Sequence, residues 1–313
     1  MRVASACLVF CIVPAALAQP AVVGLDASRG GDASLQFGSG MTQLRSGLLA
    51  AFPSMTFRSI ATLTALNPAT DDVVFFSSAR AGTTAITPLS TQEKQILLAF
   101  ISAGGGALLF VDNDTFAGAG SDAVNESMLD PFGLDALGTG APWERSAHVA
   151  NPGASPVTSG PFGTVTSFSV GWTGWFSALG PYASSLATLV DNNQPCLAVI
   201  PCNAIAPGSG PVVLFSDSTM ISNGFLTAAN LMLVRNAMAY ASQTCGPTCD
   251  PIDFNGDGLF PDTADIDDFL SVFSGGPCST GTCGDIDFNN DGLFPDTSDI
   301  DSLLSVFSGG PCL

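Results

Sequence analysis

Short apolar runs alternate with helix-period segments along residues 20–243 of the chain. The runs that we expect to form strands are residues 21–25, 55–59, 73–76, 107–111, 197–200 and 212–215. The segments with apolar side chains at helical spacing are residues 41–52, 90–101 and 227–241. The second of these begins with a capping box, because Ser90 is followed three positions later by Glu93. Strands that alternate with helices predict an α/β domain whose parallel sheet is covered on both faces.

The last part of the chain has a different pattern, a tandem repeat with a period of 34 residues. Residues 249–278 return almost unchanged as residues 283–312. Apolar side chains at positions i, i+3, i+4 and i+7 predict one helical stripe in each copy. They are Ile266, Phe269, Leu270 and Phe273 in the first copy, and Ile300, Leu303, Leu304 and Phe307 in the second. Each helix should end at Ser-Gly-Gly-Pro, and the two units should face each other through Phe and Leu.

An acidic loop precedes each of these helices. Its first residues are Asp253, Asn255, Asp257 and Gly258 in one copy, and Asp287, Asn289, Asp291 and Gly292 in the other. Asp-x-Asn-x-Asp-Gly opens an EF-hand calcium loop, in which alternate oxygen side chains point at a hard Ca²⁺ ion and glycine permits a sharp turn. Because the motif occurs twice in phase, we expect two bound calcium ions.

The closing half of each loop departs from the EF-hand pattern. The twelfth position, where the closing acid belongs, holds Ala264 in one copy and Ser298 in the other, and an aspartate follows each. One extra residue in Leu-Phe-Pro would place the remaining acids on the ninth-position and closing roles. These acids are Asp262 and Asp265 in the first copy, and Asp296 and Asp299 in the second. The sequence leaves open which main-chain carbonyl completes each shell, that of Leu259 or Phe260 and that of Leu293 or Phe294.

Paired loop–helix calcium repeats without an entering helix resemble dockerin domains, which attach secreted proteins to cohesin partners. The resemblance covers residues 245–313 and is greatest to the Cys-flanked, dockerin-like tails of secreted planctomycete-type bacterial proteins. It implies attachment to a cohesin-like or cell-envelope protein. It also implies calcium ligation by Asp253, Asn255, Asp257, Asp265, Asp287, Asn289, Asp291 and Asp299. The alternative is a calcium-stabilised structural tail that has no partner.

Residues 1–18 have the features of an export signal. Met1 and Arg2 precede an apolar stretch at residues 6–16, and small residues end at Ala18. The stretch is too short to span a bilayer, and no other reaches about eighteen apolar residues. We therefore expect a secreted or cell-surface protein without a transmembrane segment. Its parts are a signal peptide at 1–18, an α/β body at 19–243 and a calcium-binding tail at 244–313.

Export permits disulfide bonds, and seven of the nine cysteines follow the expected signal. The four that flank the repeats are Cys249, Cys278, Cys283 and Cys312. Pairing within each repeat is the simplest prediction. Pairing of 249 with 312 and of 278 with 283 is the alternative, since connectivity does not follow from sequence. We expect Cys196 and Cys202 to close a small loop, which leaves Cys245 without a partner.

The formal net charge is −19, and it is unevenly distributed. Residues 245–313 contain thirteen Asp and no Glu, Lys or Arg. Such a segment repels itself unless cations bind to it, so the charge pattern favours calcium. Nucleic-acid binding requires the opposite sign, and we exclude it.

The order of elements in the body loosely resembles class I glutamine-amidotransferase-like domains, which have a flavodoxin-like fold. The resemblance spans residues 21–241. It consists of a helix, Gly-Gly-Gly and Leu-Leu-Phe-Val-Asp, then a late Gly-Pro-Val-Val-Leu-Phe-Ser-Asp-Ser and a final helix. Enzymes of that fold carry a Cys nucleophile on a strand–helix turn and a His partner. Here Asp112, Asn113 and Asp114 follow the strand instead, so no catalytic residue carries over and we expect a non-enzymatic body.

Ligands of open α/β sheets bind at the carboxyl ends of strands. The polar side chains expected there are Asp26, Asp112, Asp114, Asp217 and Ser218. They are the first candidates for a metal or sugar site, although such residues more often cap helices and turns. His148 is the only histidine, and without a Gly-x-Ser-x-Gly elbow we expect it in a solvated loop. The three tryptophans, Trp143, Trp172 and Trp175, are more often core residues in such a region than a sugar-stacking surface.

The sequence therefore predicts an exported calcium-binding protein whose tail attaches an α/β body to a surface partner. A carbohydrate-active hydrolase that carries the same tail is the alternative from another functional class. It would show two carboxylates about 5–10 Å apart in a cleft lined by aromatic side chains.

Overall fold

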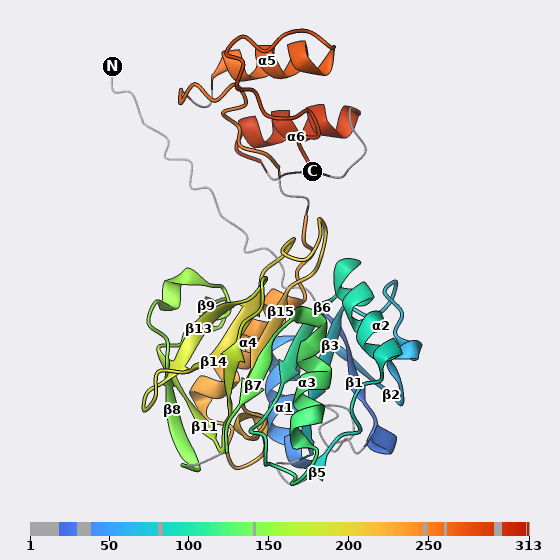
Figure 1. Cartoon of the computed structure of the whole chain (residues 1–313), viewed down its shortest axis with the longest axis vertical. Helices are drawn as coiled ribbons and strands as arrows, with labels where there is room; N and C mark the ends of the chain where they lie inside the picture. Colours follow the sequence, from blue (N-terminus) through green and yellow to red (C-terminus); the bar gives the residue numbers. More distant parts are fainter. Residues whose placement is uncertain are drawn as a thin grey trace, which may run out of the picture.

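The computed structural model describes residues 19–29, 39–80, 84–139, 142–246, 249–259, 262–290, 296–310 and 312. These residues form an α/β body and a smaller helical tail (Figure 1). The expected signal peptide at residues 1–18 lies outside the described residues. No helix in the described ranges is long and apolar enough to cross a membrane.

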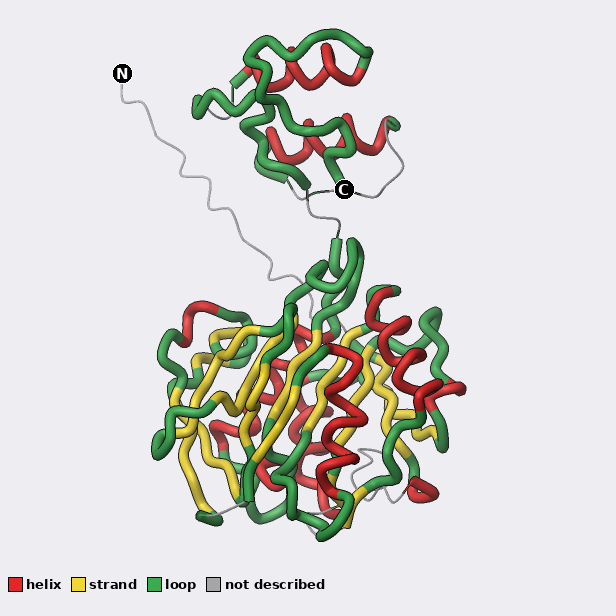
Figure 2. The backbone as a smooth tube through the Cα atoms, in the orientation of Figure 1, coloured by secondary structure: helices red, strands yellow, loops and turns green. Residues whose placement is uncertain are grey.

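A nine-stranded mixed sheet runs through the described part of the body (Figures 1 and 2). In spatial order its strands are β11 (Ser167–Gly171), β8 (Glu144–His148), β13 (Ser184–Leu189), β14 (Pro195–Ile200), β15 (Val212–Phe215), β6 (Gly106–Phe110), β3 (Val73–Ser77), β1 (Ala21–Leu25) and β2 (Thr56–Ile60). Strands β15, β6, β3, β1 and β2 are parallel to one another. The predicted α/β class and flavodoxin-like parallel sheet are therefore confirmed.

The parallel strands are the ones that the apolar runs predicted. β3, β6 and β15 are buried along their whole length, as expected of strands with a helix layer on each face. The other half of the sheet, β14, β13, β8 and β11, is antiparallel and was mostly missed. β8 alternates exposed and buried residues, and its polar composition conceals a strand.

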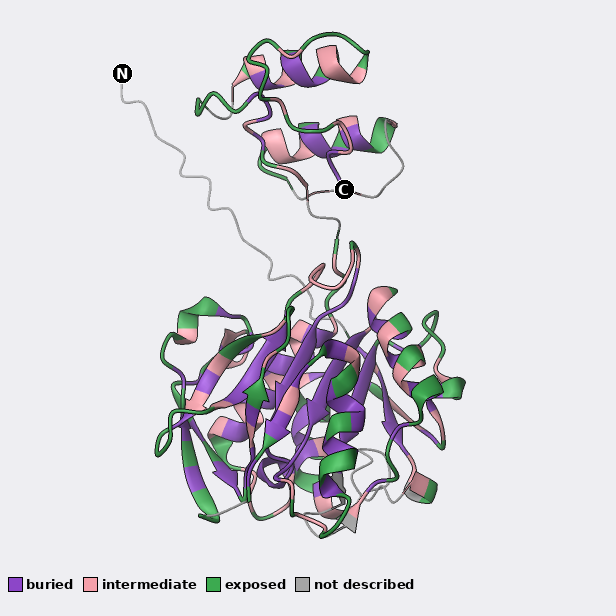
Figure 3. Ribbon diagram, in the orientation of Figure 1, coloured by how far each residue is buried: buried purple, intermediate pink, exposed green. Residues whose placement is uncertain are grey.

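Helices cover both faces of the sheet, which is buried between them (Figure 3). α1 (Thr42–Ala51) and α4 (Ala228–Ala241) contribute to one core layer through residues such as Leu48 and Leu233. α2 (Thr91–Ser102) and α3 (Ser121–Leu129) contribute to the other through residues such as Leu97 and Met128. The predicted capping box at the start of α2 is confirmed, and α3 was not predicted.

Shorter elements complete the described body. The small strand pairs are β4 (Ala79–Arg80) with β5 (Thr84–Ala85), β7 (Asp135–Leu137) with β12 (Trp175–Ala178), and β9 (Ser159–Gly160) with β10 (Gly163–Thr164). The 3₁₀ helices are η1 (Ala27–Arg29), η2 (Ser39–Met41), η3 (Leu63–Ala65), η4 (Asp130–Phe132), η5 (Pro152–Ala154) and η6 (Thr219–Ile221).

The tail contains one helix per repeat, α5 (Thr263–Phe273) and α6 (Thr297–Phe307). It has a hydrophobic cluster of its own, centred on Phe254, Phe288, Phe269 and Leu303. Each helix ends before a glycine with positive φ, Gly275 or Gly309, as predicted. The apolar stripe of each helix is narrower than predicted, because Leu270 of α5 and Leu304 of α6 are exposed.

Three disulfides link described cysteines, and their pattern contradicts our simplest predictions. Cys249 pairs with Cys312 and Cys278 with Cys283, so pairing within each repeat was wrong and the alternative is correct. The first bond joins the two ends of the tail, and the second joins one repeat to the next. The two bonds link the repeats to each other. This pairing is possible because the equivalent loops pack together, which brings Cys249 and Cys312 close.

The predicted Cys196–Cys202 bond was also wrong. Cys202 pairs instead with Cys245, the cysteine that we expect to have no partner. Cys196 is a free, buried thiol because it lies within β14 and faces the core beside Leu197. The strand stretches the chain by about 3.3 Å per residue, so it keeps positions 196 and 202 too far apart for a disulfide.

Candidate functional site

The side chains of the first acidic loop turn inward onto the loop backbone. The Asp257 amide donates to Asp253 Oδ1 and to Asn255 Oδ1, at 3.0 Å in each case. The amide of Gly258 donates to Asp253 Oδ2 at 2.9 Å, and that of Leu259 to Asp257 Oδ1 at 2.8 Å. Gly258 has φ +77°, the left-handed turn for which the motif requires glycine. The structure thus brings the first three predicted oxygen side chains together.

Asp262 and Asp265, predicted to close this loop, form the capping box of α5. Asp265 Oδ2 accepts from the Asp262 amide at 3.1 Å, and its Oδ1 accepts from the Asn255 amide at 3.3 Å. Asp265 is 0% exposed, whereas the Leu259 side chain is 67% exposed. The closing acid therefore joins loop to helix, and Leu259 has only its main chain to offer as a ligand.

The second loop repeats these contacts where it is described. Asp299 is also 0% exposed, and it accepts from the amides of Asn289 at 3.4 Å and Asp296 at 3.0 Å. Asp287 precedes Asn289 in the same register, with its amide bonded to Asp285 Oδ1. Two of the predicted ligands, Asp291 and Leu293, lie outside the described residues.

Two reciprocal backbone hydrogen bonds join the loops. The amide of Asp250 donates to the Phe288 carbonyl at 2.8 Å, and the amide of Gly284 donates to the Phe254 carbonyl at 2.9 Å. These positions are equivalent under the 34-residue period. The two repeats are thus related by an internal two-fold relation.

The donor chemistry of the loops fits calcium, because every predicted ligand is an oxygen atom. In the described ranges, no group of three or more His, Cys, Asp or Glu side chains is placed to hold a metal ion. The predicted first-loop set also includes an amide oxygen and a main-chain carbonyl. The carboxylates of the first loop accept hydrogen bonds from loop amides. Their remaining lone pairs would be the ones to ligate an ion.

In the body, the structure brings together two of the predicted strand-end acids. Asp112 follows β6 and Asp217 follows β15, and each is 1% exposed. The Ser218 hydroxyl donates to Asp112 Oδ2. Asp217 accepts from the amides of Gly171 at 2.7 Å and Thr219 at 2.8 Å.

Burial changes the ionisation of this pair. It raises the pKa of Asp112 to about 6. Burial, followed by the charge of Asp112, raises the pKa of Asp217 well above its usual range. Two carboxyl groups in one dry site cannot both ionise at low cost, so the pair retains a proton near neutral pH.

The other predicted strand-end residues lie outside this pair. Asp26 accepts from the Ser28 amide and hydroxyl, so it caps η1. Asp114 accepts from the Gly138 amide at 3.1 Å. His148 is exposed as expected, but it lies at the end of β8 rather than in a loop, because its backbone pairs with Ser167.

Sequence analysis missed the residues that hold the carboxylate pair. Asn113 donates to Asp112 Oδ1 through both its amide and its side chain. Asn125 of α3 donates to the Asp112 carbonyl and accepts from the Asp112 amide. Asp-Asn-Asp after a buried strand is a turn signal that identifies the first of these. No local signal identifies Asn125, which comes from another element.

The three tryptophans separate into two environments. Trp175 is partly buried against the core, as predicted. Trp143 and Trp172 are exposed and in contact, with ring centroids 4.9 Å apart. The prediction that they are core residues is therefore wrong for two of the three, because both lie beside β-strand ends rather than under a helix.

Comparisons with known proteins bear on the fold of the body. No family model matches the chain, and no curated protein matches it. The mmIFT52 N-terminal domain has a TM-score of 0.53 at 13% identity, covering 71% of this chain and 97% of that one. A ThuA-like protein from Bacteroides uniformis has a TM-score of 0.45 at 12% identity, over 73% and 94%. A β-galactosidase from Bacillus circulans sp. alkalophilus has 0.44 at 13%, over 74% and 32%. At these identities the likeness concerns the α/β fold alone.

Proposed function

We propose that residues 249–312 form a calcium-dependent docking module, which attaches the α/β body to a scaffold or envelope protein outside the cell. The module would hold two calcium ions, one in each acidic loop. Calcium would supply the positive charge that links the loop oxygens to one another. The partner would be a cohesin-like protein or another component of the cell envelope.

The observation that carries this proposal is the burial of Asp265 and Asp299. Both carboxylates are 0% exposed at equivalent positions, in a segment that contains no Lys, Arg or His. Buried charges in proteins are paired with an opposite charge or coordinate a metal. Amide donors and the helix N-terminus supply partial compensation here. A cation in each loop would complete it.

A second observation favours a partner for the tail. Leu270 and Leu304 occupy equivalent positions on α5 and α6, and they are 44% and 46% exposed. Their neighbours Phe269 and Leu303 are fully buried. Each helix therefore packs one side on the shared core and presents a leucine outward, where a partner would cover it.

The environment agrees with export. The three disulfides of the described chain indicate an oxidising compartment. The alternative of a glycosidase loses support, because the Asp112 and Asp217 carboxylates are buried and cannot reach a substrate. We therefore assign the body a binding or display role.

Calorimetric titration of the full chain with Ca²⁺ tests the ion sites. We expect two ions per chain for the native protein, and one for Asp257→Asn, because that change removes a carboxylate from the first loop only. Asp267→Asn is the matched control, since Asp267 is an exposed acid on α5 outside the loop. No calcium heat in the native chain, or two ions in Asp257→Asn, would contradict the proposal.

Docking is tested separately, by retention of the purified chain on envelopes of the producing cell. Retention should require Ca²⁺, be reversed by EGTA, and be lost in the double change Leu270→Gln and Leu304→Gln. Leu137→Gln is the control, because Leu137 of the body is also 46% exposed. If the double variant binds calcium and is still retained, this leucine surface is not the docking face. If the native chain is not retained at all, the docking role is wrong and the calcium sites stand on their own test.

A further inference from the structure

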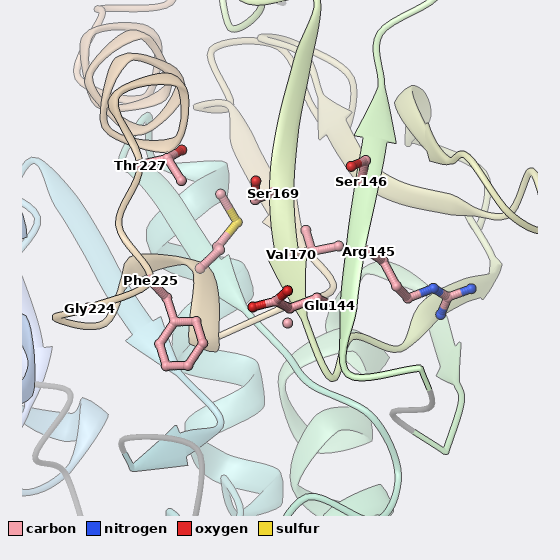
Figure 4. Close-up of a pocket in the computed structure, with 10 residues that line it drawn as sticks. Glu144, Arg145, Ser146, Ser169, Val170, Gly224, Phe225 and Thr227 are labelled. Atoms are coloured by element: carbon pink, nitrogen blue, oxygen red, sulfur yellow. The ribbon is translucent and has the colours of Figure 1, made fainter.

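A groove of about 460 Å³ lies on the body beside the carboxyl end of β11. One wall is the antiparallel pair of β8 and β11, and the other is the segment from η6 to the start of α4. The lining residues are Glu144, Arg145, Ser146, Ser169, Val170, Gly171, Met220, Gly224, Phe225 and Thr227. The Glu144 carboxylate and the Phe225 ring are directed into the same space, whereas the Arg145 guanidinium points away from it (Figure 4).

Three aromatic rings border one end of this groove. Trp143 and Trp172 have centroids 4.9 Å apart at an interplanar angle of 53°. Phe225, which belongs to the groove wall, meets Trp143 edge-on at 5.4 Å. The two indoles are 42% and 46% exposed. They form an exposed aromatic pair that is joined to the groove wall through Phe225.

The backbone of Trp172 is strained, and burial of the side chain does not offset the cost, because the ring is 46% exposed. Its φ is +42°, a left-handed conformation that bulky residues rarely adopt. The conformation is fixed from both sides, since the Trp172 amide donates to the Trp143 carbonyl at 2.7 Å and the Trp172 carbonyl accepts from Asn113 Nδ2 at 2.6 Å. Asn113 is buried and bonded to Asp112. A strained, exposed ring held by a buried network is typical of a ligand site.

The charges around the groove define the kind of ligand. Glu144 contributes an exposed carboxylate. Arg145 provides no counter-charge, because its guanidinium makes three hydrogen bonds to Asp191 at 2.7–3.2 Å. The groove therefore repels anions. The exposed Ser146 and Ser169 add hydroxyl groups to its lining, whereas the Thr227 hydroxyl is bonded to Asn230 at the start of α4.

We propose that this groove binds a neutral carbohydrate chain. A pyranose ring has an apolar C–H face, which would stack on the exposed Trp172 indole, and hydroxyl groups at its edge, which would hydrogen-bond to Glu144 and the groove hydroxyls. Glu144 is the only Asp or Glu that lines the described groove, and glycoside hydrolysis requires two such groups on the substrate. The site therefore binds sugar without cleaving it. This inference concerns the body alone and does not depend on calcium in the tail.

Electrophoresis of the full chain through gels that contain one soluble polysaccharide tests the proposal. The probes are galactomannan, xyloglucan, mixed-linkage β-glucan and laminarin, with polygalacturonate as the anionic comparison. We expect retardation in at least one neutral gel, and binding about tenfold weaker in Trp172→Ala. Trp172→Gly should lose binding equally while folding at least as well as the native chain, because glycine adopts φ +42° without strain.

Tyr182→Ala is the matched control, since Tyr182 is 38% exposed but lies outside the groove. It should bind like the native chain. Retardation by none of the neutral polysaccharides would overturn the proposal. Unchanged binding in a folded Trp172→Gly variant, or preferential binding of polygalacturonate, would overturn it as well.

Discussion

Asp112 and Asp217 are two acidic side chains that the fold places in the interior without a basic partner. Backbone amides and the hydroxyl of Ser218 satisfy their oxygens, so the pair meets its hydrogen-bonding needs within the protein. Ionisation of the pair is nevertheless unfavourable, because burial away from water disfavours the charged form of a carboxyl group. The network therefore stabilises the ends of β6 and β15 most when the pair retains its protons.

We predict that this pair lowers stability as the pH rises. In the unfolded chain both carboxyls ionise near about pH 4. In the folded chain the pKa of Asp112 is about 6 and that of Asp217 is raised well above its usual range. The folded protein thus binds more protons in this window, and the free energy of unfolding falls as the pH rises from about 4 through about 6, by roughly 3 kcal/mol for Asp112 alone. Urea unfolding at several pH values should show a flatter slope for Asp217→Asn.

A control variant removes a contribution to stability that has the opposite pH dependence. Hydrogen bonds from Arg145 lower the pKa of Asp191, so Asp191 contributes stability that is present above its unfolded pKa and lost on acidification. Asp191→Asn should therefore remove an acid-sensitive contribution and leave the higher-pH slope intact. An identical slope in Asp217→Asn and the native chain would show that the buried pair is not the source.

At this scale the sequence identifies some site residues and not others. Asp112 and Asp217 were predictable as a place to look, because each follows a run of apolar residues that forms a buried strand. The exposed position of Trp172 was not predictable, because the hydrogen bond that holds its backbone comes from Asn113, 59 positions away in the sequence. Local patterns record which residues end a strand, but not which distant amide holds them.

Among the elements, the central strands were predictable and the peripheral ones were not. β3 and β6 are continuous apolar runs because both of their faces are covered. β8, β11 and β13 contain serine, threonine and glycine, since part of each faces solvent. The same limit applies to the disulfides, where equal spacing favoured pairing within a repeat and the packing of the repeats decided otherwise.

The two tail disulfides should contribute unequally to the stability of their elements. The Cys249–Cys312 bond spans 63 positions and the Cys278–Cys283 bond spans 5. In the chain-entropy model, closing the longer loop stabilises by about 4 kcal/mol and the shorter by about 2 kcal/mol. Replacing both cysteines of the longer bond with serine should therefore lower the melting temperature of α5 and α6 more than the same change in the shorter bond. Circular dichroism with calcium held constant measures the difference, and equal losses would contradict it.

On the scale of the whole molecule, charge and apolar cores divide the chain in the same place. Thirteen of the 27 acidic residues lie in residues 245–313, which have no basic residue. The body has two large core layers, and the described tail has one small cluster. On the proposal that each loop binds calcium, we expect the tail to depend on bound cations for a larger share of its stability than the body does.

Calorimetry of the full chain should accordingly show two transitions with different responses to calcium. Ca²⁺ at about a hundred times its dissociation constant adds about 2.7 kcal/mol per site to the state that binds it. We expect the smaller transition to move to higher temperature and the larger one to stay in place. Mg²⁺ at equal concentration should shift the smaller transition less, because it demands a stricter geometry. One transition that moves as a whole would contradict this division.

The Cys202–Cys245 bond gives the chain a particular response to mechanical load. α4 ends at Ala241, four positions before the bonded Cys245, and Cys202 lies two positions after the end of β14. If the tail is held by a surface and the body is dragged by flow, tension passes through the sulfur atoms to the end of β14. That strand is hydrogen-bonded to β13 on one side and β15 on the other. The pull therefore enters the middle of the sheet, and α4 is not unwound from its end.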